Sequence, residues 1–333
     1  MMSAFLEQIA VGLHIPDGFL SVPVSIAWWV LTIASVAIAV RRTSGALHER
    51  QIPLMGVMAA FIFAAQMLNF PVLGGTSGHL LGGALAALLL GPWAGILVMT
   101  VVLALQALLF QDGGLLAMGA NIFNMGVATA LVGYGMGMPL LRVFGGRPWG
   151  LALVGFVVAW ASVMAAAVLT SIQLVLSGVP AAIVFPLMLF VHTFIGIGEG
   201  LITLAALSFV ITTRPDIVSS LAAVVGPEGL QRRVGGGTIG TVTLVGMAFA
   251  IGAALISPFA SGDPDGLERV AEDQGFLERA QDAPFNILPD YTIPGIDGGL
   301  STILAGVIGL LIVFALIYGI SQMLRARAEA AER

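Results

Sequence analysis

The sequence predicts an all-α protein that crosses a membrane several times, and three observations lead to this fold class. Apolar residues make up 58% of the chain, and its mean hydropathy is +1.03. Only 9% of the residues are charged, whereas a soluble domain usually carries about 25%. The apolar residues are also gathered into runs, and a helix needs about 20 of them to cross the hydrocarbon core of a bilayer.

Nine apolar runs are candidates for such helices. They span residues 21–40, 53–70, 80–90, 93–110, 121–141, 149–177, 183–212, 239–258 and 299–324. The third run is short, and only Gly91 and Pro92 separate it from the fourth. Its boundaries are therefore the least well defined of the set.

The positions of the Arg residues predict the orientation. Short cytoplasmic segments collect Lys and Arg, and this chain has 13 Arg and no Lys. With nine spans and the N-terminus outside, 11 of the 13 Arg lie on the inside. The segment 259–298 then lies outside, and its nine acidic and two Arg residues leave it with seven net negative charges. We therefore predict that the N-terminus is outside and the C-terminus inside.

The composition excludes several classes of function. The absence of Cys rules out disulfides and thiolate metal sites. A Walker A phosphate-binding loop needs a Lys, so this chain cannot hydrolyse ATP through one. No run is basic enough for binding nucleic acid. Any metal chemistry must use His, carboxylate, Met or backbone groups.

Two of the four His residues are predicted to meet at the outer face. His14 precedes the first span in LHIPDGFL, where Pro16 and Asp17 favour a turn, and His79 opens the third span after a Gly-rich loop. A histidine where a loop joins a helix is more often a hydrogen-bonded structural residue than a metal ligand. Both interpretations stay open on the residues alone.

Polar side chains within the predicted spans are further candidates, because each costs free energy in lipid unless it faces the bundle interior. His192 and Glu199 lie seven residues apart, two turns along one helix. They either support a metal site or pathway, or they form a hydrogen-bonded pair that fixes helix packing. Asn121 and Asn124 lie near the outer end of the fifth span, and we expect one of them to orient a metal-binding group.

Four motifs carry a resemblance to a known family. They are HIPDGFL at 14–20, GGTSGHLLGG at 74–83, DGGLLAMGANIFNMG at 112–126 and VHTFIGIGEGLIT at 191–203. Together they resemble the CbiM/NikM-type substrate-binding membrane component of cobalt and nickel energy-coupling-factor transporters. The PDGLE sequence at 264–268 is similar to the signature of the small CbiN/NikN-like partner of these transporters. The chain thus looks like a fusion of the two subunits.

The resemblance implies a metal site. In that family the ion is held by the N-terminal amine, by the amide nitrogen and imidazole of a His at position two, and by a second His before the third span. These positions match His14 and His79. Four nitrogens in a plane suit Ni²⁺, Cu²⁺ and low-spin Co²⁺. Using an amide nitrogen displaces its proton, so binding should weaken as the pH falls.

The start of the chain departs from the family pattern. Leu13 stands where the family has its initiator Met, after twelve extra residues. We expect that translation starts at residue 13, from a TTG or CTG codon read as Leu. Alternatively, the twelve residues are trimmed, or they remain and another ligand takes the place of the amine.

The predicted organisation follows from these motifs. An extension at 1–12 precedes a seven-helix binding component at 13–213. A cytoplasmic linker at 214–238 leads to a two-helix PDGLE module at 239–333 with the acidic loop 259–298. That loop either concentrates cations, is merely solvated, or contacts the binding component.

The resemblance implies a plasma-membrane component that captures Ni²⁺ or Co²⁺ for ATP-driven import. It would hold no permanent cofactor, and its partners would be a CbiQ/NikQ-like coupling subunit, two CbiO/NikO-like ATPases and membrane lipid. The HIPDG start favours nickel. A competing hypothesis is a proton-driven secondary metal transporter with Glu199 as carrier. An intramembrane enzyme using His192 and Glu199 is disfavoured, because no HExxH motif is present.

Overall fold

The computed structural model describes residues 14–44, 51–144, 147–214, 217–225 and 239–331. The predicted extension, Leu13 and most of the predicted linker lie outside these residues. Its α-helices are α2 (Val22–Ser44), α3 (Gln51–Gln66), α4 (Gly83–Leu90), α5 (Pro92–Leu105), α6 (Met118–Asn121), α7 (Thr129–Val143), α8 (Pro148–Leu176), α9 (Ala181–Thr213), α10 (Ser219–Val225), α12 (Ile239–Ile256), α13 (Gly266–Asp273) and α14 (Gly299–Ala331). Shorter helical segments are η1 (Gln106–Phe110), η2 (Ile122–Ala128), η4 (Ser257–Phe259), η5 (Leu277–Arg279) and η6 (Pro289–Tyr291).

The prediction of a nearly all-α membrane protein is confirmed. In the described part of the chain, seven helical segments are long and apolar enough to cross a membrane. They are Val22–Ser44, Pro92–Phe110, Met118–Val143, Trp149–Leu176, Ala181–Thr213, Gly240–Phe259 and Gly299–Ala330. Two further predicted runs correspond to the shorter helices α3 and α4.

The third predicted run is too short to cross a membrane alone. Helix α4 has eight residues, which span about 12 Å at about 1.5 Å per residue, against a hydrocarbon core of about 30 Å. Every residue of α4 is buried, so protein rather than lipid surrounds it. The apolar run marked a buried helix here rather than a complete span.

A small β-hairpin between α3 and α4 was not predicted. Strands β1 (Phe70–Val72) and β2 (Thr76–Gly78) pair antiparallel, with Phe70 opposite Gly78. Strands of three residues are too short to show the alternation by which a strand is recognised in a sequence. The hairpin matters for the site because His79 directly follows β2.

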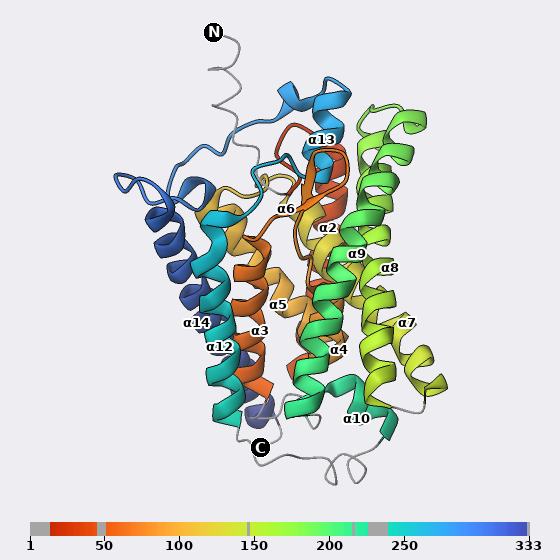
Figure 1. Ribbon diagram of the computed structural model, residues 1–333, viewed down its shortest axis with the longest axis vertical. Coiled ribbons are helices and arrows are strands. Elements are labelled where there is room, and N and C mark those ends of the chain that lie inside the picture. Colours follow the sequence, from red (N-terminus) through yellow and green to blue (C-terminus); the bar gives the residue numbers. More distant parts are fainter. Residues whose placement is uncertain (1–13, 45–50, 145–146, 215–216, 226–238, 332–333) are drawn as a thin grey trace.

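Figure 1 shows that the helices run between two ends of the molecule. The start of α2, α6 and α13 lie at one end, and α10 lies at the other. Arg41 and Arg42 lie in the last turn of α2, and Arg142 lies in the last turn of α7, which contacts α10. Which side of the membrane each end faces stays a prediction.

The last two long helices pack on the remainder of the bundle through α3. Both α12 and α14 contact α3, and α14 also contacts α5 (Figure 1). Between them, the segment 259–298 passes over the end of the bundle, where α13 packs against α9 and β2. This segment therefore lies directly over the residues that follow β2.

Candidate metal site

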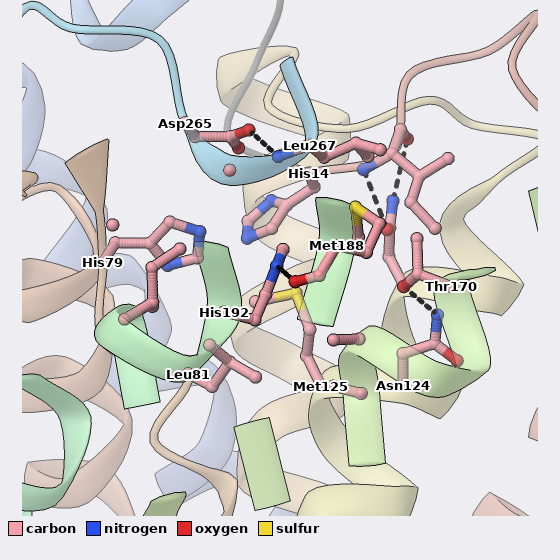
Figure 2. A pocket seen from close by; sticks show the side chains of 17 residues that line it. His14, His79, Leu81, Asn124, Met125, Thr170, Met188, His192, Asp265 and Leu267 are labelled. Atoms are coloured by element: carbon pink, nitrogen blue, oxygen red, sulfur yellow. Dashed lines mark hydrogen bonds between the residues drawn. The ribbon is translucent and has the colours of Figure 1, made fainter. Parts of the chain in front are cut away.

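The structure brings His14 and His79 together. His14 lies just before α2 and His79 just after β2, and their ring centroids are 5.5 Å apart with the planes at 89°. Both side chains are buried. Figure 2 shows the two rings facing the same cavity, with His192 nearby.

The spacing of the two rings is close to that of two imidazoles bound to one metal ion. With metal–nitrogen bonds of about 2.0–2.1 Å, a bound ion lies about 3.2 Å from the centre of each imidazole ring. Two such rings at neighbouring corners of a planar site are then about 4.5 Å apart, and at opposite corners about 6.4 Å. The observed centroid distance of 5.5 Å differs by about 1 Å from either value, so the rings would have to shift by about that much to share an ion in a planar site.

One nitrogen of His14 is engaged, and the other has no partner. Nδ1 lies 3.0 Å from Oδ1 and 3.2 Å from the backbone oxygen of Asp112. Nε2 is buried and has no hydrogen-bond partner. Burial alone would lower the pKa of His14, but the charge and hydrogen bonds of Asp112 outweigh it and raise the pKa above 6.5. Nε2 can bind a metal ion only when it carries no proton, so protonation of His14 competes with metal binding.

Asp112 is itself held by a residue from the distant acidic segment. The hydroxyl of Tyr291 donates to Oδ2 of Asp112 at 2.6 Å, and Nε2 of Gln106 donates to the Tyr291 oxygen at 3.0 Å. Burial disfavours the charged carboxylate, but the charge of His14 and these hydrogen bonds lower the pKa of Asp112 below 3.8. A series of polar contacts thus runs from Gln106 through Tyr291 and Asp112 to His14, and its last link is the 3.0 Å ion-pair contact between Oδ1 and Nδ1.

Sequence reasoning missed both Asp112 and Tyr291. Asp112 did carry a signal, since it is the only acidic residue between positions 50 and 198. Tyr291 is one of three Tyr in the chain and lies in an irregular segment without periodicity. The only signal for Tyr291 in the sequence was the small number of Tyr residues.

Asn121 fixes the backbone next to His14. Its Oδ1 accepts from the Ile15 amide at 3.1 Å, and its Nδ2 donates to the Ile15 carbonyl at 3.0 Å. Asn124 instead pairs with Gln173, through amide hydrogen bonds of 2.8 Å in both directions. Both Asn side chains line the cavity, but only Asn121 holds the His14 segment.

Glu199 holds the backbone that follows His79. Its carboxylate accepts hydrogen bonds from the amides of Leu81 and Gly82, at 2.5 and 2.9 Å, just before α4 begins. Nδ1 of His192 lies 2.8 Å from the carbonyl of Met188, one turn earlier in α9. The expected alternative of a hydrogen-bonded pair between His192 and Glu199 does not appear among the hydrogen bonds of the described residues.

The cavity between these residues is about 70 Å³ in volume, enough for a few water-sized groups. Its lining comes from both ends of the chain: His14, Ile15, Gly78, His79, Leu81, Asn121, Asn124, Met125, Ala166, Ala167, Thr170, Met188, His192, Ile195, Asp265, Gly266 and Leu267. The last three belong to the PDGLE sequence, which covers the cavity from above in Figure 2.

The PDGLE turn is bound to β2. The Ser77 amide donates to the Pro264 carbonyl at 2.8 Å, and the Ser77 hydroxyl donates to the Asp263 carbonyl at 2.7 Å. Asp265 then caps α13 by accepting from two backbone amides, and burial raises its pKa to about 6. A Cβ at Gly266 would lie 2.9 Å from Cδ1 of Ile195 and 3.0 Å from Cε1 of His192, so any larger residue would crowd α9 here.

The same segment also holds the turn that contains the HIPDG sequence. The amide of Gln281 donates to the Asp17 carbonyl at 2.8 Å, and the Asp17 side chain accepts from the Ala117 amide at 2.9 Å. Gly18 has a φ of +90°, and a Cβ there would overlap the Arg279 carbonyl. Both histidine-bearing segments are thus in contact with residues 259–298.

The two imidazoles do not complete a metal site by themselves. No group of three or more His, Asp or Glu side chains with a metal-binding arrangement occurs among the described residues. Further ligands would have to be backbone groups, Met side chains of the lining or groups outside the described ranges.

Comparison with known families gives two matches along the chain. Residues 14–217 match the family described as the cobalt uptake substrate-specific transmembrane region, CbiM. Residues 237–326 match the PDGLE domain.

Among individual relatives, a protein of Archaeoglobus fulgidus named "Putative fused nickel transport protein NikMN" is 36% identical over 94% of this chain and 99% of its own length. The cobalt transport protein CbiM of Sorangium cellulosum is 35% identical over 64% of this chain and 97% of its own. A solved structure described as a truncated transition metal transporter is similar with a TM-score of 0.53 and 32% identity. It covers 60% of this chain and 98% of its own.

Proposed function

Because this chain belongs to the CbiM family, fused to a PDGLE domain, we propose that it is the substrate-capture component of an ATP-driven importer for Ni²⁺ or Co²⁺. The relatives are named as nickel or cobalt transport proteins. The recognition of the two joined families from the sequence motifs is thereby confirmed. The importer class, the ion preferred and the individual ligands are our proposal.

One observation carries the proposal. Two buried imidazoles from segments 65 residues apart face one cavity, with their ring centroids 5.5 Å apart. Burying an imidazole nitrogen without a partner costs free energy, and Nε2 of His14 is such an atom. A metal ion is the natural partner for it, since neutral imidazole is a common metal ligand.

We propose His14 and His79 as the side-chain ligands. A start at residue 13 would add an amine and make the His14 amide available, which gives the four nitrogens that Ni²⁺ and low-spin Co²⁺ prefer. A chelate ring with its own amide requires Nδ1 of His14, whereas Nε2 is the nitrogen without a partner here. The visible spectrum of the bound ion distinguishes these two modes of coordination.

The chain would depend on other proteins for energy. It contains no Lys and hence no Walker A motif. We propose a CbiQ/NikQ-like coupling subunit and two CbiO/NikO-like ATPases as partners at the α10 end. The HIPDG sequence and the fused nickel relatives favour nickel over cobalt.

Transport driven by proton carriage on Glu199 is disfavoured by its contacts. The carboxylate already accepts two backbone hydrogen bonds at the start of α4. Protonation would weaken both, and the loop that carries His79 would lose its anchor. Glu199 therefore acts as a structural acceptor in our proposal.

The test is metal retention by the purified full chain. Wild type should hold one Ni²⁺ or Co²⁺ per chain, His79→Ala and His14→Ala should lose it, and His192→Ala should keep it. Identification of the N-terminal residue by mass spectrometry on the same sample tests the start at residue 13. If wild type retains neither ion, or if His79→Ala binds like wild type, the proposal is wrong.

A further inference from the structure

Tyr291 reaches from the PDGLE module into the binding component. Its side chain is 7% exposed, and its ring stacks on Phe110 with centroids 4.7 Å apart and planes at 17°. Phe63 of α3 lies beside it at 6.0 Å. Close by, the Leu288 amide donates to the Leu109 carbonyl at 3.0 Å. This part of the segment is therefore seated on the binding component by ring packing and a backbone hydrogen bond.

The backbone at this position is unusual. Asp290 has a φ of +48° and Tyr291 a φ of +55°, in the left-handed region that residues with a Cβ rarely adopt. Such conformations cost free energy and persist where surrounding contacts hold them, often at functional sites. Here they turn the Tyr291 ring toward Asp112, where its hydroxyl makes the 2.6 Å hydrogen bond.

From this arrangement we infer that Tyr291 is a positioning residue for metal capture: it fixes the Asp112 carboxylate, which in turn holds the His14 ring with Nε2 toward the cavity. The inference rests on the proposed function, in the mode of coordination in which His14 binds the ion through Nε2 while Nδ1 stays at Asp112. It makes the PDGLE module a contributor to the binding site, by a side chain that does not touch the metal itself.

The contact between Asp112 and His14 should affect how well His14 binds a metal ion. A carboxylate that accepts the N–H of a metal-binding imidazole fixes its tautomer and makes its other nitrogen a better ligand. Here Oδ1 of Asp112 lies 3.0 Å from Nδ1 of His14 as an ion-pair contact, and the Asp112 backbone oxygen lies 3.2 Å from the same nitrogen. The Tyr291 hydroxyl on Oδ2 holds the carboxylate in this contact. Without that hydroxyl the His14 ring is less constrained. Part of the free energy of metal binding would then be needed to orient the ring.

Tyr291→Phe tests this role, because it removes the hydroxyl and keeps the ring that packs on Phe110. The matched control is Tyr318→Phe in α14, whose hydroxyl contacts only Gln322 among the hydrogen bonds described. We would measure the Ni²⁺ dissociation constant by chelator competition, the visible spectrum of bound Ni²⁺, and the unfolding temperature, all on the full chain.

We expect Tyr291→Phe to raise the dissociation constant, but by less than the about tenfold or more expected for Asp112→Asn, because Tyr291 contacts the outer partner of the ligand and not the ligand itself. The spectrum should change with it, and Tyr318→Phe should do neither. In an Asp112→Asn background, Tyr291→Phe should have no further effect on Ni²⁺ affinity, because the route from the hydroxyl to His14 is already broken.

Other outcomes overturn the inference. If Tyr291→Phe lowers only the unfolding temperature, with affinity and spectrum unchanged, Tyr291 serves packing alone. Tighter binding in this variant would mean that the series opposes metal capture. Equal losses with and without Asp112→Asn would exclude action through Asp112. Failure of wild type to bind Ni²⁺ or Co²⁺ would instead refute the proposed function.

Discussion

Replacing Asn121 with Ala should weaken metal binding through the backbone next to His14. The Ile15 carbonyl also accepts from the Gly114 amide at 3.0 Å, so it keeps a partner in the variant. The Ile15 amide has only the Asn121 oxygen among the hydrogen bonds described, at 3.1 Å. The variant therefore leaves one buried N–H unpaired beside a proposed ligand.

The size of the effect follows from that unpaired group. A buried donor without a partner costs about 1–3 kcal/mol. If the whole cost appears in metal binding, the dissociation constant rises by about 5-fold to about 150-fold. The loss should be smaller where the His14 segment relaxes toward water, so we expect a value in the lower half of this range.

Asn124→Ala is the matched control, since it lies one helical turn away and lines the same cavity. It breaks the pair with Gln173 between η2 and α8, far in sequence from either His. Both variants should lower the unfolding temperature, but only Asn121→Ala should weaken Ni²⁺ binding measured by chelator competition. Equal loss of affinity in both variants, or unchanged affinity in Asn121→Ala, would refute this reasoning.

Further predictions concern the supports of the site and the energy source of uptake. Glu199→Gln keeps an acceptor for only one of the two backbone N–H groups before α4, so it should lower the unfolding temperature and weaken Ni²⁺ binding. ATP-dependent uptake by the wild type in vesicles that contain the partner subunits should persist when a protonophore collapses the proton gradient; loss of uptake on its addition would revive proton carriage. Burial raises the pKa of Glu268 to about 7, above its usual 4.5, so the stability it contributes is complete below about pH 4.5 and is lost as the pH rises through about 7. Glu268→Gln should therefore raise the unfolding temperature at pH 8 but leave it unchanged at pH 4, where an equal gain would contradict this assignment. Gly18→Ala should impair docking of residues 259–298, seen as faster proteolysis there, because its Cβ overlaps Arg279, whereas Gly74→Ala, with φ +86° and open surroundings, should not.

The sequence alone predicted the spanning helices and the meeting of the two histidines. Long apolar runs identified the spanning helices, because a helix that crosses a bilayer needs about 20 consecutive apolar residues. His14 and His79 could be placed together, since both lie at outer ends of predicted spans, and the structure puts their rings 5.5 Å apart. Helix α4 shows the limit, because apolar composition does not reveal whether protein or lipid covers a helix.

The supports of the site could not be predicted for a different reason. Tyr291 and Asp112 are 179 residues apart and meet through loops that have no periodicity. The hydrogen bonds of Asn121 to Ile15 likewise depend on where an irregular segment before α2 turns. Such contacts follow from tertiary packing rather than from local preference.

Residues 259–298 are covalently joined to the binding component that they contact. The segment lies between α12 and α14, which themselves pack on α3. It therefore meets the histidine segments at the high effective concentration of an intramolecular encounter, at millimolar levels for short connections. Contacts too weak to hold a separate subunit can then keep this segment docked, and each binding component receives one such segment. A cover held by a few hydrogen bonds can also open and reseat quickly, because its partner never diffuses away.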